Sequence, residues 1–193
     1  MSTFPRRGLL VIGTVVVCAF ALGSQTPPAA GAADAKLAAD FEGRVKQYLQ
    51  MRNKVAGHPL KPTDVPQEIL GHQRDLADKV RVARAGAKQG EIFAPEIAGY
   101  FRRQIAASFA GPHGKQIRAS LQHAEPVKME LQINQSYPED VPLQSTPPTL
   151  LLNLPQLPDG LEYRLLDREL VLRDTQANII VDYVPNALPE PPK

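Results

Sequence analysis

The chain has 193 residues, of which 22 are basic and 20 acidic, and 43% of its side chains are apolar. This length suits one globular domain or two small ones. Arg6 and Arg7 are the only charged residues before Asp34, so the chain beyond residue 32 has no net charge. That disfavours a nucleic-acid binder, which needs an excess of Lys and Arg to displace counterions. Cys18 is the single cysteine and lies in the same leading segment, so the rest of the chain has no cysteine chemistry.

Residues 1–32 have the pattern of a cleaved secretory signal. Two arginines precede an apolar run from Gly8 to Gly23, which as a helix spans about 24 Å, less than the ~30 Å of a hydrocarbon core. Ala30-Gly31-Ala32 has the small residues that a cleavage site needs. We therefore expect a mature chain from Ala33, periplasmic or secreted, with no transmembrane span after cleavage. General secretion is favoured over the twin-arginine route that Arg6-Arg7 suggests, and an uncleaved anchor helix is the alternative.

Residues 33–124 are predicted to be helical. Apolar residues recur at three- and four-residue spacing and predict helices over 34–56, 66–87 and 95–109, with a short fourth helix over 116–123. In the second helix Leu76 and Val80 are expected to face inward, and Arg84 to lie on the polar face. Pro95 fits the first turn of the third helix, where its missing N–H costs nothing.

Residues 125–184 are predicted to form a β region. Alternating apolar residues predict a half-buried strand over 127–133. A segment rich in proline and leucine follows, up to Gly160, and is expected to pack in extended form. Strands over 161–166, 169–173 and 178–184, joined by turns at Asp167 and Asp174, predict an antiparallel meander. Residues 185–193 form a Pro-rich tail.

The predicted fold class is therefore α+β, with three or four N-terminal helices packed on a small C-terminal antiparallel sheet. The strands are apolar on both faces, so we expect the helices to cover one face and the Leu150–Leu154 segment the other. Residues 34–124 carry a net charge of +6 and residues 125–193 a net charge of −6. This split favours docking of the two portions on each other; an exposed charged face for a partner is the alternative.

The most concentrated candidate for binding is basic. Arg102 and Arg103 fall on the polar side of the third predicted helix, and Lys115 and Arg118 flank a Gly-containing turn near a possible helix start. Such a cluster suits an anion: a phosphate, a lipid headgroup or a cell-wall carboxylate. The alternative is an ordinary solvated helix face.

No pattern predicts catalysis. The four histidines have no metal-ligand spacing, so neither a metal nor a cofactor is expected. Asp167 and Asp174 lie at predicted turns, where aspartate serves the backbone, and Asp182 on the last strand is expected to face solvent. General acid–base catalysis needs two carboxyl groups held in a cleft, and no pair is singled out.

The C-terminal part resembles a known family. The segments that carry this resemblance are LPQLPDGLEYR (154–164), ELVLR (169–173) and NIIVD (178–182). They are similar to the end of RcnB-like bacterial periplasmic proteins, which have a Leu/Pro-rich approach, a glycine followed by an aromatic residue, and a hairpin. The aromatic residue does not follow Gly160 directly, and Ala177-Asn178 replaces the Thr-Gly turn. The resemblance implies a small periplasmic β module; the family's metal-homeostasis role does not carry over, because no His-rich ligand set is present.

The sequence thus predicts an exported bacterial envelope or periplasmic protein that is a non-catalytic binding or accessory module. Its partner would be an envelope protein or an anionic envelope component. The alternative is an enzyme or enzyme-inhibitor module whose site converges only in three dimensions.

Overall fold

The computed structural model describes residues 29–57, 63–122, 130–138 and 146–190. Five helices precede three strands, as the α+β prediction requires: α1 (Ala29–Ala56), α2 (Pro66–Ala83), α3 (Pro95–Ala110), α4 (Gly114–Gln122), α5 (Pro148–Leu151), β1 (Leu161–Leu166), β2 (Glu169–Asp174) and β3 (Ile179–Val184). The strands form one antiparallel sheet in the order β1-β2-β3. The predicted fold class is confirmed.

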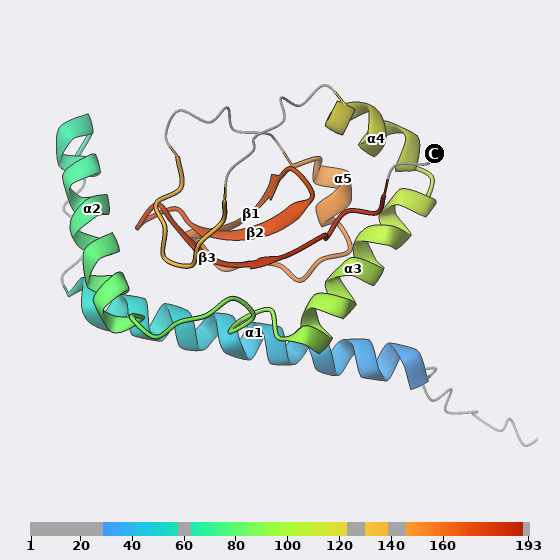
Figure 1. The fold of residues 1–193 in the computed structure, drawn as a ribbon, viewed down its shortest axis with the longest axis horizontal. Helices are drawn as coiled ribbons and strands as arrows, with labels where there is room; N and C mark the ends of the chain where they lie inside the picture. The colour runs from blue at the N-terminus through green and yellow to red at the C-terminus, as the bar shows by residue number, and fades with distance from the viewer. Residues whose placement is uncertain (1–28, 58–62, 123–129, 139–145, 191–193) are drawn as a thin grey trace, which may run out of the picture.

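In Figure 1 the sheet lies above α1, and α2 and α3 stand on either side of the sheet. Both α2 and α3 begin with proline at the first helical position, where no N–H partner is needed. On the helix-facing side, the core is centred on aromatic rings: the Phe101 ring lies 4.9 Å from that of Phe41 and 5.0 Å from that of Phe93, centroid to centroid. Leu150 and Leu154 belong to this same core.

The meander closes with tight turns. Leu166 pairs with Glu169, so Asp167 and Arg168 form the predicted two-residue loop. Asp167 and Asn178 adopt positive φ angles of 52° and 50°, which aspartate and asparagine tolerate better than most residues. A register shift between Leu172 and Arg173 marks a bulge in the β2–β3 pair.

The outer face of the sheet is covered, but not by the expected segment. Tyr137, Leu166, Val171 and Ile180 form a second buried cluster there, and Tyr137 belongs to residues 130–138. This segment pairs irregularly with β3: Asn134 N–H donates to the Ile180 carbonyl at 2.8 Å. The prediction that Leu150–Leu154 covers this face is wrong, because those leucines pack on the helix side.

Other local expectations are revised as well. Residues 130–133 form no strand, and Asn134 takes a positive φ of 64° that interrupts extended backbone; residues 127–129 lie outside the described part. The Pro/Leu-rich segment includes the helical turn α5. In the Pro-rich tail, Ala187 and Leu188 are buried, and their N–H groups donate to the Arg168 carbonyl.

The predicted signal segment up to residue 28 lies outside the described residues, and α1 starts earlier than predicted, at Ala29. Within the described residues, none of the helices combines the length and apolar character that a membrane crossing demands.

Candidate functional site

A cleft of about 710 Å³ lies between α1 and the chain that leaves α2. Its volume is within the range of known ligand pockets. Both charged and apolar side chains line it: Ala39, Asp40, Gly43, Arg44, Gln47, Tyr48, Met51, Ala83, Arg84, Gly86, Ala87, Glu91 and Ile92. One wall is therefore α1 and the other is the segment 83–92, two parts of the chain that helix periodicity alone does not bring together.

A buried carboxylate of β2 fixes the α1 wall. Asp174 is fully buried, and its Oδ2 accepts a 2.7 Å hydrogen bond from the Tyr48 hydroxyl and a 3.3 Å bond from Arg52 Nη1. Its Oδ1 accepts from the N–H groups of Gln176 and Ala177, so it also holds the β2–β3 turn, as predicted for an aspartate there. Burial, followed by the charge of Asp174 and the bond to it, raises the pKa of Tyr48 above its ordinary value. Tyr48 therefore stays protonated and donates.

A second buried carboxylate, from β3, fixes the opposite wall. Asp182 is fully buried, which makes its predicted solvent exposure wrong. Its two oxygens accept hydrogen bonds of 2.7 to 2.9 Å from the backbone N–H groups of Gly90, Ile92, Phe93 and Tyr183. The loop between α2 and α3 wraps around the carboxylate because a buried charge must be met by donors.

Arg84 connects the two walls at the base of the cleft. Only 8% of this residue is exposed, so its predicted place on the polar face of α2 is wrong. Its guanidinium donates to Asn134 Oδ1, to the Val181 carbonyl and to Glu91 Oε2, and lies 5.2 Å from the centre of the Tyr48 ring. Arg84 follows Leu76 and Val80 at intervals of four residues, and this spacing would have placed Arg84 on the buried face of the helix.

The rim of the cleft is polar. Arg44 donates through Nε to Asp40 Oδ2 at 3.2 Å and through Nη1 to the Glu91 carbonyl at 2.8 Å. Arg44 therefore bridges from α1 to the opposite wall. The Asp40 and Glu91 side chains are about half exposed, and Gln47 is exposed. The rim thus offers hydrogen-bond donors and acceptors, and with Arg84 at the base the lining side chains carry two negative and two positive charges.

The four basic residues predicted as a binding cluster lie in different surroundings. Arg102 donates to the Pro185 carbonyl at 2.8 and 3.1 Å, which ties α3 to the tail. Arg103 pairs with Asp34 at 2.6 Å. Lys115 and Arg118 lie exposed on α4, and Arg118 donates to the Phe109 carbonyl. Within the described structure, no contact joins these four side chains into one site, and their role in anion binding stays a prediction.

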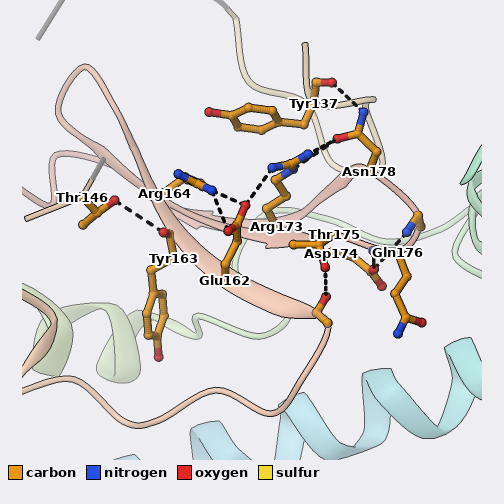
Figure 2. Close-up of polar contacts among 12 residues, drawn as sticks. Tyr137, Thr146, Glu162, Tyr163, Arg164, Arg173, Asp174, Thr175, Gln176 and Asn178 are labelled. Carbon is orange, nitrogen blue, oxygen red and sulfur yellow. Dashed lines mark hydrogen bonds and ion pairs between the residues drawn. The ribbon is translucent and has the colours of Figure 1, made fainter. Parts of the chain in front are cut away.

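A second polar group lies on the outer face of the sheet (Figure 2). Glu162 accepts bonds of 2.7 Å from both Arg164 and Arg173. Arg173 also donates to Asn178 Oδ1 and lies 4.5 Å from the centre of the Tyr137 ring. Burial raises the pKa of Glu162, but its bonds to the two arginines and their charges outweigh burial and hold it below the ordinary value. Each polar group has a partner within the network, which stabilises the sheet and holds the segment at Tyr137 against it.

Comparison with known proteins adds no relative: no protein-family model, no curated protein and no solved structure matches this chain. The likeness of the C-terminal segments to RcnB-like proteins therefore stays a prediction. The cleft is the feature that the local sequence pattern did not reveal, since its residues were assigned to separate helices and a turn. Two residues could have indicated the site in the sequence. Arg52 and Arg84 are charged, yet each stands four residues after a buried residue, Tyr48 and Val80 respectively.

Proposed function

We propose that this chain is an exported bacterial envelope or periplasmic protein, a non-catalytic binding or accessory module whose ligand lies in the cleft between α1 and residues 83–92. One observation carries the binding role. Each wall of the cleft is fixed by a separate, fully buried carboxylate, Asp174 for α1 and Asp182 for the loop. Burying a charge is costly unless it is fully hydrogen-bonded.

Buried polar networks of this kind fix one arrangement of the elements that they join. A preformed cleft loses less conformational freedom on binding, and so gains affinity. The carboxylates themselves are enclosed and saturated with donors, whereas the exposed polar groups are those of the rim. This arrangement favours recognition over proton transfer, because the groups that a ligand meets at the rim are already paired with one another.

The proposal of export depends on the basic start, the apolar run and the small residues of the predicted signal. Intact mass of the protein recovered from the envelope of its host should give a chain that begins at Ala33. A protein that keeps Met1, or that stays with the cytoplasmic fraction, contradicts export.

The binding role is tested in the same cells by a photo-crosslinking amino acid placed at Gln47, on the rim. We expect one recurring adduct that is absent when the same group is placed at Gly71. Gly71 is a matched control because it is an exposed position of α2 outside the cleft, with open space around it. Equal yields of the same adduct at both positions, or none at Gln47, contradict the proposal.

A further inference from the structure

We infer that the cleft binds an extended, charge-balanced peptide segment of a partner protein. This inference rests on the proposed binding function and adds the chemical class of the ligand.

The shape of the cleft favours an elongated ligand. Its α1 wall runs from Ala39 to Met51, which at the rise of an α-helix is about 18 Å. An extended peptide covers that distance with about five or six residues. Gly43 lies along this wall and Gly86 along the other, and a Cβ atom added to either would meet nothing within 4 Å. The space at both glycines is therefore open.

The charged side chains of the cleft select against ligands with one strong charge. Asp40 is bonded to Arg44 at the rim, and Glu91 to Arg84 at the base, so each carboxylate is already paired with a guanidinium group and the four side chains together carry no net charge. A peptide main chain carries alternating donors and acceptors and no net charge. Gln47, Asp40 and Arg44 are spaced along α1 and present both kinds of hydrogen-bonding group to such a chain.

A sugar chain is also elongated and uncharged, but it fits this cleft less well. Tyr48 is the aromatic residue among the lining side chains, and the Arg84 guanidinium lies 5.2 Å from the centre of its ring. Its hydroxyl is bonded to the buried Asp174. Tyr48 is 5% exposed and leaves little ring surface on which a sugar could stack. We therefore assign peptide as the ligand class.

The test begins with peptides selected from a random dodecapeptide phage library on the full chain. Their affinities for the protein and its variants are then measured by fluorescence anisotropy. Gly43→Phe fills the cleft, and Ala39→Phe blocks the same wall at an exposed position. Each is expected to weaken binding at least about tenfold, a loss of about 1.4 kcal/mol. Gly71→Phe, an equal change in α2, should leave the affinity unchanged. Circular dichroism melts establish that each variant is folded.

Two results would overturn the inference. In the first, the library yields no binder, or the selected peptides bind both blocked variants as well as they bind the original protein. In the second, N-acetylglucosamine oligomers bind and Gly43→Phe abolishes that binding, so the ligand is a sugar chain. The second result would leave the proposed binding role intact, and the crosslinking at Gln47 tests that role independently of the ligand class.

Discussion

Asp182→Asn is the substitution that most directly tests how the cleft is held. The change keeps the size of the side chain but replaces one acceptor oxygen by an NH2 donor. Oδ1 accepts from the N–H groups of Gly90 and Tyr183, and Oδ2 from those of Ile92 and Phe93. Whichever way the amide turns, two N–H groups then face a donor: the part-buried pair of Gly90 and Tyr183, or the buried pair of Ile92 and Phe93.

The expected cost follows from these contacts. A hydrogen bond to a charged group contributes about 1.5–3 kcal/mol, so losing two lowers the free energy of unfolding by about 3–6 kcal/mol. This is a large share of the ~5–15 kcal/mol of a typical domain. Urea unfolding should show a lower midpoint. Hydrogen exchange should be faster than in the original protein at the pair of amides that faces the NH2 group, either Gly90 with Tyr183 or Ile92 with Phe93.

The control is Asp75→Asn, which removes the charge of an exposed residue paired with Lys79 at 2.7 Å on α2. Exposed pairs contribute about 0–1 kcal/mol, so this variant should unfold close to the original midpoint. If Asp182→Asn costs less than about 1 kcal/mol, its carboxylate does not hold the loop. The argument for a preformed cleft would then lose its second wall.

Leu172→Ala and Ile180→Ala each remove a fully buried side chain, one on each face of the sheet, and should each cost about 2–5 kcal/mol in urea melts; near-neutral values would mean that the faces are not both covered. Arg173→Ala should cost about 1–2 kcal/mol because it removes a bond to Glu162 and those to Asn178. Glu162 has a lowered pKa when folded, so its stabilising effect is present above its unfolded pKa of about 4.3 and is lost as the pH falls through the folded pKa. The stability gap between the protein and Glu162→Gln should therefore narrow in acid, and a gap that widens there would refute this sign. Gly43→Ala should raise stability by about 0.5–1 kcal/mol, since it adds helix propensity in open space, and a loss would show that the space is not free.

The sequence predicted the elements whose periodicity is regular. The three long helices, the meander and its two-residue loop are found where apolar spacing and turn residues placed them. Both sheet faces are buried because residues such as Val171 and Leu172 alternate in direction while both are apolar. These features depend on local patterns, which a single sequence contains.

The failures have a common physical cause. Arg84 and Asp182 are charged, and charge predicts exposure unless the partner groups are known. Those partners are backbone carbonyls and N–H groups far away in the chain, which carry no sequence signal: Arg84 donates to the Val181 carbonyl, and Asp182 accepts from the loop at Ile92. The site was missed because it is built from such contacts.

The cleft belongs to the whole fold rather than to the helices that line it. Its carboxylates come from β2 and β3, while its walls come from α1 and the α2–α3 loop. In the part of the chain that the structure describes, the direct ion pair between residues 34–124 and residues 125–193 is the buried one of Arg52 with Asp174, at 3.3 Å. Residues 34–124 alone would leave the Tyr48 hydroxyl and the N–H groups of Gly90, Ile92 and Phe93 without the carboxylates that accept from them, and would leave Arg84 with Glu91 but without Val181. The helices on their own should therefore not keep the cleft in this shape. Binding by the cleft and cooperative folding of the two portions are therefore expected to be lost together.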